Sequence, residues 1–190
     1  MKYDKLVRDA FRESVAIRRV GAPDIKNIVK AALKIAQSLK KGGKVYIFGN
    51  GGSAADSQHI AAELAGRFKK DRLSLPAEAL TVNTSTLTAL ANDYGYDSVF
   101  SHIIKGICKK GDVLIALSAG GNSPNVVNAV LEGKKIGCLV LGFTGKSGGK
   151  LKEIADYAIH VKSQNTPRIQ EMHITWGHIL CEIIEEELFG

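Results

Sequence analysis

Hydrophobic residues in the first forty positions recur every three or four residues, which is the period of an α-helix. The two stripes consist of Leu6, Val7, Ala10, Phe11 and Val15, and of Ile25, Ile28, Val29, Ala32, Ile35, Ala36 and Leu39. The segment Gly21-Ala22-Pro23 separates them, and proline is favoured in the first turn of a helix. The pattern therefore predicts two amphipathic helices with a break at residues 21–23.

From Lys44 onward the pattern changes to short apolar runs that alternate with helical segments. The predicted strands are 45–48, 78–82, 113–117, 138–141 and 157–161, and the predicted helices are 54–67, 97–108, 124–135, 150–155 and 168–188. Such alternation is typical of a parallel sheet covered by helices on both faces. We therefore expect one domain, 1–190, of the α/β class. A helical hairpin, 1–42, precedes a doubly wound five-stranded parallel sheet in 43–190.

Polar, glycine-rich segments follow three of the predicted strands, at 49–53, 83–85 and 118–123. Open α/β sheets bind their ligands outside the carboxyl ends of the strands. Glycine in these segments allows a backbone to approach a ligand closely. The sequence therefore predicts a binding site at this edge of the sheet.

The composition is that of an ordinary globular protein, with 45% hydrophobic and 24% charged residues. No apolar run approaches the length of a membrane span, and the charged N-terminus has no apolar core of a secretory signal. Cys108, Cys138 and Cys181 are isolated and in no metal-binding spacing, as expected of reduced thiols. We therefore expect a cytoplasmic protein with no membrane partner.

The formal net charge of +7 is compatible with a nucleic acid, an acidic partner or an anionic substrate. Lysine pairs lie near the ends of predicted helices, where they complement the helix dipole. These pairs are Lys40-Lys41, Lys69-Lys70, Lys109-Lys110 and Lys134-Lys135. Because no basic stripe is interleaved with aromatic residues, we expect no nucleic-acid partner.

Positions 49–54 match the dinucleotide fingerprint G-x-G-x-x-A. That fingerprint also requires an acidic residue at the end of the next strand, to bind a ribose hydroxyl. The predicted second strand ends near Asn83, without a carboxylate. We therefore expect no nucleotide or redox cofactor.

The segment 118–123 precedes a predicted helix that opens at Pro124. Backbone N–H groups at a helix start, together with nearby hydroxyls, form an anion site. Ser123 is also suited to cap this helix without any ligand. The two interpretations are compatible, and the glycine pair before Ser123 favours a bound phosphate.

His59 and Glu63 are four residues apart on a predicted helix of small apolar residues, so their side chains share one face. They form either an internal ion pair or part of a site, and the residues alone leave both open. Gln170, His173 and His178 lie on the last predicted helix, where an isolated histidine is more often structural. The residue types present are a carboxylate, an imidazole and a phosphate cradle.

Five motifs together resemble a known family. They are G-N-G-G-S-A-A-D-S-Q-H-I-A-A-E-L at 49–64, A-N-D-Y-G at 91–95, G-N-S-P-N at 121–125, R-I-Q-E-M-H at 168–173 and G-H-I-L at 177–180. They resemble the motifs of sugar isomerase (SIS) domain proteins, and among these the phosphoheptose isomerases, over essentially the whole chain. The resemblance implies a ketose–aldose isomerase that converts sedoheptulose 7-phosphate to D-glycero-D-manno-heptose 7-phosphate.

The resemblance also implies the residues that do this. Substrate contacts are implied for Asn50, Gly51, Gly52, Ser53, Glu63, Asn92, Asp93, Ser118, Ala119, Gly120, Ser123 and Gln170. Glu63 and His178 are the implied acid/base pair. In zinc-containing members one ion per subunit would be held by His59, Glu63, Gln170 and His178, a ligand set that suits zinc. A carboxylate bound to zinc is a poorer base, so Glu63 cannot fill both roles at full strength.

Gln170 and His178 are eight residues apart, which is roughly 12 Å along a straight helix and about 80° around it. One site that used both from one helix would be strained. We therefore expect each site to be assembled from more than one subunit, and the resemblance implies a homotetramer. The two N-terminal helices, if exposed, would supply the interface.

Two features weigh on this interpretation. The family usually has Ser-Thr-Ser-Gly-(Asn/Lys)-Ser in the third loop, whereas Ala119 and Gly120 here lack two of the hydroxyls. Each hydrogen bond lost to a charged phosphate would cost ~1.5–3 kcal/mol.

The alternative function is a non-catalytic SIS adaptor that binds a replication initiator protein. Such adaptors lack the glutamate and histidine that this chain has at Glu63 and His178.

Overall fold

The computed structural model describes residues 3–20 and 25–190. The predicted break at 21–23 lies outside these residues. The helices are α1 (Asp4–Val20), α2 (Ile25–Lys40), α3 (Gly52–Ala65), α4 (Thr84–Tyr94), the short 3-10 helix η2 (Tyr96–Ser98), α5 (Val99–Ile107), α6 (Pro124–Ile136), α7 (Gly149–Ile154) and α8 (Thr166–Phe189). The strands are β1 (Val45–Gly49), β2 (Ala77–Ala79), β3 (Val113–Ser118), β4 (Leu139–Thr144) and β5 (Tyr157–His160). None of the helices in the described ranges is long and apolar enough to cross a membrane.

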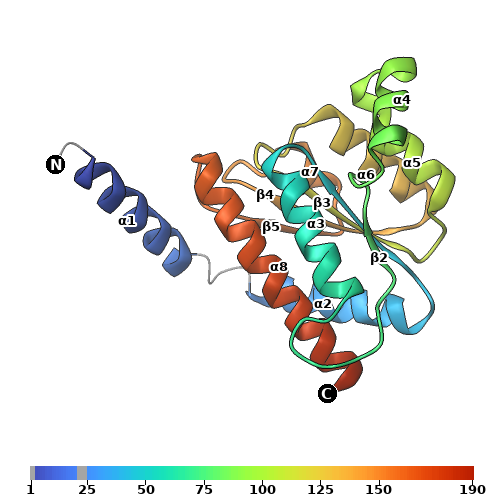
Figure 1. The fold of residues 1–190 in the computed structure, drawn as a ribbon, viewed down its shortest axis with the longest axis horizontal. Coiled ribbons are helices and arrows are strands. Elements are labelled where there is room, and N and C mark those ends of the chain that lie inside the picture. The colour runs from blue at the N-terminus through green and yellow to red at the C-terminus, as the bar shows by residue number, and fades with distance from the viewer. Residues whose placement is uncertain (1–2, 21–24) are drawn as a thin grey trace.

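The five strands form one parallel sheet in the order β2-β1-β3-β4-β5 (Figure 1). The predicted fold class, a doubly wound α/β sheet with helices before it, is therefore confirmed. The chain moves from β1 outward to β2 and then returns to β3 on the other side of β1. The strand order thus reverses between β1 and β3, and ligands of such sheets bind at this switch point.

Alternate residues of the central strands face two separate cores. Val45 and Ile47 of β1 belong to the core beneath α2, α3 and α8, whereas Tyr46 and Phe48 belong to the core beneath α5, α6 and α7. This follows from the period of two residues along a strand. Burial on both faces explains why the strands read as continuous apolar runs.

The segment after β2 is where the sequence interpretation was wrong. A strand was predicted over 78–82 and a polar loop at 83–85, but β2 ends at Ala79 and residues Thr84–Tyr94 form α4. Asn83 caps this helix, because its side chain accepts a hydrogen bond from Thr86 N at 3.0 Å. None of its residues is fully buried, and its apolar face consists of only Leu87, Leu90 and Ala91, which periodicity did not reveal.

The two N-terminal helices differ in their surroundings. Ile28, Ala32 and Ile35 of α2 are buried in the sheet core, so most of this stripe is packed within the subunit. None of the described residues of α1 is buried. The expectation that both helices are exposed is thus met by α1, whereas the exposed large apolar residues of α2 are Ile25 and Val29 at the edge of the predicted stripe, together with Leu33.

Candidate active site

The turn after β1 brings Gln170 of α8 against the start of α3. A Cβ placed at Gly52 would lie 2.6 Å from the Gln170 Nε2 atom, so the absence of a side chain at Gly52 allows this contact. Gly51 has a φ of 56°, which favours glycine. Ser53, in the first turn of α3, is buried. The structure thus joins the predicted substrate contacts of this turn to Gln170.

Asn50 links this turn to α6. Its Nδ2 atom donates to Asn125 Oδ1 and its Oδ1 atom accepts from Asn125 Nδ2, both at 2.9 Å. The Tyr96 hydroxyl also donates to Asn50 Oδ1, at 3.0 Å. The sequence interpretation did not assign Asn125 or Tyr96 to the site. The position of Asn125 directly behind the polar third loop was the signal that pointed to it.

His178 meets His59 and Glu63 because α3 and α8 pack closely. A Cβ placed at Gly177 would lie 2.6 Å from Ile60 Cδ1, so glycine is needed where the helices touch. His178 directly follows Gly177 in the sequence, and His59 directly precedes Ile60. The two histidines, 119 residues apart in the sequence, place their Nε2 atoms 3.3 Å apart.

The resulting cluster is compact. His59 Nε2 lies 3.1 Å from Glu63 Oε1, and the ligand atoms of His59, Glu63 and His178 all lie within 4.8 Å of one another. Glu63 is partly buried, with 24% of its side chain exposed, and His59 with 49% is more open. Two imidazoles and one carboxylate at this spacing fit a divalent cation such as zinc. They equally fit a base and an acid that share one substrate.

Two further ionisable groups border the cluster. Burial raises the pKa of Asp56 to about 6, while the nearby His59 acts in the opposite direction. Burial, followed by the charge of Glu63, raises the pKa of Cys181 to about 12. Because this thiol stays protonated at neutral pH, it is not a nucleophile. The sequence interpretation did not single out Asp56.

The third loop turns its two terminal serines toward each other. The hydroxyls of Ser118 and Ser123 lie 3.0 Å apart, and Gly121 N donates to Ser118 Oγ at 3.1 Å. Among the described contacts Ser123 makes no side-chain capping bond to α6, although Pro124 opens that helix as predicted. Pro124 has no N–H group and Val126 N donates to Asn125 Oδ1 at 3.0 Å, which leaves the Asn125 N–H at the start of α6 to bind an anion.

Ala119 and Gly120 lie beside this serine pair. They border a cavity of about 160 Å³ whose other walls include Lys146, Ser147 and Ser163. Gly145 N donates to Ala119 O at 2.8 Å, which ties the loop after β4 to the third loop. The two positions that lack hydroxyls, Ala119 and Gly120, therefore lie beside a lysine and two serines from neighbouring loops.

Asn92 and Asp93 are not part of the cluster around His59. They lie exposed at the end of α4, where Asn92 Nδ2 donates to Asp93 Oδ1 at 2.9 Å. Gln170 is likewise about two helical turns from His178, at the level of Gly52. Within one subunit the structure thus brings together three of the four expected zinc ligands.

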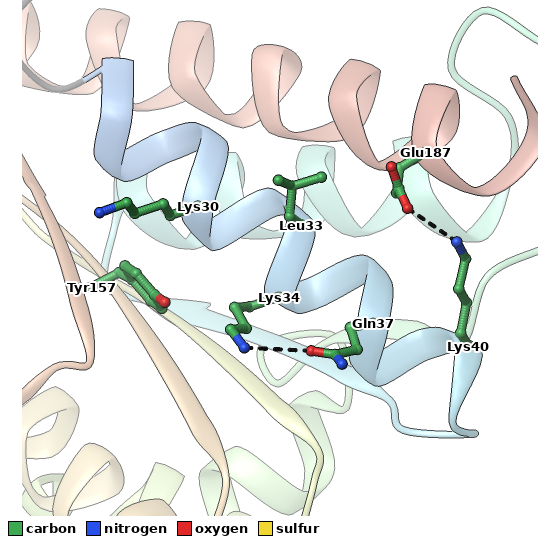
Figure 2. A pocket seen from close by; sticks show the side chains of 7 residues that line it. All are labelled: Lys30, Leu33, Lys34, Gln37, Lys40, Tyr157 and Glu187. Atoms are coloured by element: carbon green, nitrogen blue, oxygen red, sulfur yellow. Dashed lines mark hydrogen bonds and ion pairs between the residues drawn. The ribbon is translucent and has the colours of Figure 1, made fainter.

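A second hollow, of about 870 Å³, lies away from these residues (Figure 2). Its walls come from α2, the first residue of β5 and the end of α8: Lys30, Leu33, Lys34, Gln37, Lys40, Tyr157 and Glu187. Lys40 pairs with Glu187 and Lys34 with Gln37. Because Tyr157 begins its strand, this hollow lies at the amino edge of the sheet, where open α/β sheets do not place their ligands.

Comparison with known proteins identifies the family of this chain. Residues 11–145 match the model of the SIS domain family. The phosphoheptose isomerase of Nitratiruptor sp. is 56% identical over 160 residues, which cover 84% of this chain and 86% of the relative. That of Aquifex aeolicus is 50% identical and is covered over 95% of both chains.

Comparison with solved structures identifies the same family. The phosphoheptose isomerase of Neisseria gonorrhoeae is 39% identical, with a TM-score of 0.91 over 96% of this chain and 98% of that chain. That of Francisella tularensis is 33% identical, with a TM-score of 0.93 over 98% and 99%. In fold, length and sequence, this chain belongs to the SIS domain family and, within it, to the phosphoheptose isomerases.

Proposed function

We propose that this chain is a cytoplasmic ketose–aldose isomerase that converts sedoheptulose 7-phosphate to D-glycero-D-manno-heptose 7-phosphate. The observation that carries the proposal is the meeting of Glu63 and His178 beside His59. A carboxylate and an imidazole from two helices are the groups that proton transfer between neighbouring carbons requires. The membership in the phosphoheptose isomerases supplies the substrate.

Glu63 acts as the base in this mechanism. It removes the proton from C1 of the ketose, which gives an enediol, and returns the proton to C2 to form the aldose. His178 gives a proton to the C2 oxygen and takes one from the C1 oxygen, a task suited to an imidazole near neutral pH. C1 is oxidised as C2 is reduced within the same sugar, so the reaction has no net electron transfer and needs no redox or nucleotide cofactor.

The phosphate is anchored by the third loop. Ser118, Ser123 and the backbone N–H of Asn125 supply donors, and Ser53 at the start of α3 is a further donor in this proposal. Ala119 and Gly120 contribute backbone groups alone. A fixed phosphate holds C1 and C2 at the acid/base pair, which lowers the entropic part of the barrier.

His59, Glu63 and His178 fit a zinc ion by the nature of their donor atoms, and Gln170 is the fourth ligand that we propose. Bound zinc would polarise the sugar carbonyl as a Lewis acid. Glu63 would then be a weaker base, because a cation stabilises its carboxylate form.

We also propose that the working form is a homotetramer in which each site takes residues from more than one subunit. The distance of Gln170 from His178 supports this, since one straight helix presents them two turns apart. The exposed end of α4, which carries Asn92 and Asp93, supports it as well. Asn92 and Asp93 would complete the site of a neighbouring subunit.

The test is turnover of sedoheptulose 7-phosphate by the purified protein, with and without a chelator. Glu63→Gln should abolish turnover, whereas Glu182→Gln, an exposed glutamate of α8 that pairs with Lys69, should not. Loss on chelation with recovery on zinc addition would support the metal site. A folded protein that binds the sugar phosphate without turnover would refute the isomerase and favour the adaptor function.

A further inference from the structure

A buried ion pair holds the loop that follows α3. Arg72 Nε lies 2.8 Å from Glu185 Oε1, and each side chain is 2% exposed. The Glu185 carboxylate also accepts backbone N–H groups from Phe68 at 3.2 Å, Lys69 at 2.8 Å and Lys70 at 2.9 Å. Four donors compensate the burial of one carboxylate, so this stretch of loop is fixed to α8.

The same arginine ends the helix that carries Glu63. Arg72 Nη2 donates to Glu63 O at 2.9 Å, and Nη1 donates to Leu64 O and Gly66 O at 3.0 Å. The last carbonyls of a helix lack partners within it, and a cation there also interacts favourably with the helix dipole. Arg72 and Glu185 thus connect the end of α3, the loop and α8.

Phe68 lies in the loop that Arg72 and Glu185 hold, and its side chain contacts the site. Its ring stacks on His178, with centroids 5.6 Å apart and an angle of 27° between the planes. His59 meets the same imidazole at an angle of 68°, with centroids 4.9 Å apart. The His178 ring therefore touches Phe68 and His59, and its rotation is restricted.

We propose that Phe68 is a positioning residue of the isomerase, held by Arg72 and Glu185 so that its ring fixes the His178 imidazole beside His59 and Glu63. The terminal torsion of a histidine is broad, so packing has to select one orientation. A misplacement of about 1 Å is enough to lower a rate strongly. This inference rests on the proposed role of His178.

The first test compares three variants by steady-state kinetics with sedoheptulose 7-phosphate. Phe68→Leu removes the flat ring and should lower kcat about tenfold with KM within about twofold, because it disturbs orientation and leaves phosphate binding intact. Phe68→Tyr keeps the ring and should retain most of kcat. Lys70→Ala, on the same loop, should match the parent protein, because its side chain pairs with exposed Glu186.

The second test asks whether Phe68 acts through His178. In a His178→Asn background, Phe68→Leu should change the residual kcat less than about twofold, since the group that it positions is gone. A tenfold further loss in that background would overturn the proposal. Equal losses from Phe68→Tyr and Phe68→Leu would overturn it as well.

A readout without turnover separates this inference from the proposed function. The His178 imidazole should give one sharp set of NMR signals in the parent and in Phe68→Tyr, and broadened or doubled signals in Phe68→Leu. Phe68→Met serves if the leucine variant does not fold. Sharp single signals in the folded variants would refute the positioning role, even if the parent is an active isomerase. A parent protein without turnover would refute the proposed function, and the NMR result would still decide the role of Phe68.

Discussion

Gly120 is one of the two positions, with Ala119, at which the third loop lacks a hydroxyl that the family pattern leads us to expect. A Cβ added at Gly120 would meet no atom within 4 Å, and its φ is not positive. The backbone therefore accepts a side chain without rearrangement. The position is bordered by Lys146 and Ser147, so it remains a polar environment suited to a phosphate.

Gly120→Ser should lower KM for the sugar phosphate about tenfold and leave kcat nearly unchanged. The added hydroxyl supplies one hydrogen bond to a charged group, and this bond is present equally in the ground and transition states. Gly120→Ala adds the carbon without the hydroxyl and is the matched control. Equal KM values for the serine and alanine variants would contradict this account.

His173 is a buried histidine that the site does not use. Burial lowers its pKa to about 4, although its contact with Thr144 O at 3.2 Å acts in the opposite direction. Below pH 6.5 the unfolded chain binds a proton that the folded chain excludes until pH 4. Stability from this residue is therefore fully present above pH 6.5 and is lost as pH falls toward 4.

We expect the free energy of unfolding to fall by about 2 kcal/mol from this source between pH 6.5 and 5. His173→Gln should remove that part of the pH dependence, as measured by urea unfolding at both pH values. Asp56 has a raised pKa, so its contribution to the free energy of unfolding changes with pH in the opposite direction. Because Asp56 is present in both the parent protein and His173→Gln, its contribution cancels when the two are compared. Identical pH dependence in the two proteins would refute this prediction.

At the scale of elements, the contact between α3 and α8 is the feature on which the site depends. Ile60 is fully buried, and a Cβ at Gly177 would lie 2.6 Å from its Cδ1 and Cγ1 atoms. A packed isoleucine has no space to move into, so the helices would have to separate. The neighbouring His178 would then move away from His59.

Gly177→Ala should therefore destabilise the protein by ~1–3 kcal/mol and lower kcat as well. Gly106→Ala is the contrasting variant, because Gly106 also lies in a helix but has open space around the added carbon. It should raise the free energy of unfolding by about 0.5–1 kcal/mol. Chemical denaturation and turnover assays of both variants test the pair, and a neutral Gly177→Ala would contradict the close-packing argument.

At the scale of the whole molecule, α1 presents an apolar face with no partner among the described residues. Val7, Phe11 and Val15 recur every four residues along one side and are 49%, 70% and 48% exposed, whereas the opposite side of the helix is polar. The helix is nevertheless joined to α8, since Arg168 Nη1 donates to Ala10 O and Ser14 Oγ to Glu171 Oε2, both at 2.8 Å. A fixed apolar face of this kind fits a contact with another subunit.

Phe11→Glu should shift the protein to smaller species in sedimentation velocity and lower turnover more than tenfold, because a buried charge weakens an apolar contact. Ala16→Glu adds the same charge about 140° away on the same helix and is the control. It should change neither property. Full activity in a Phe11→Glu monomer would refute the proposal that sites are shared between subunits.

Much of the fold followed from local pattern. The strand and helix periods predicted the sheet, the helix of His59 and Glu63, and the helix that opens at Pro124. Pattern failed for α4, whose apolar face of Leu87, Leu90 and Ala91 is short and only partly buried. It also could not tell that α2 is packed in the core while α1 is exposed, because both helices carry an apolar stripe.

The sequence by itself determined the class of fold, the family motifs and which residues share a helical turn, because periodicity and spacing are local properties. The tertiary structure decided which distant residues meet: His59 with His178, Asn50 with Asn125, and Phe68 with the carboxylate of Glu185. These contacts depend on how closely two elements pack and at which level. The closeness and level of packing are set by the side-chain volumes of both elements, so they cannot be read from either segment alone.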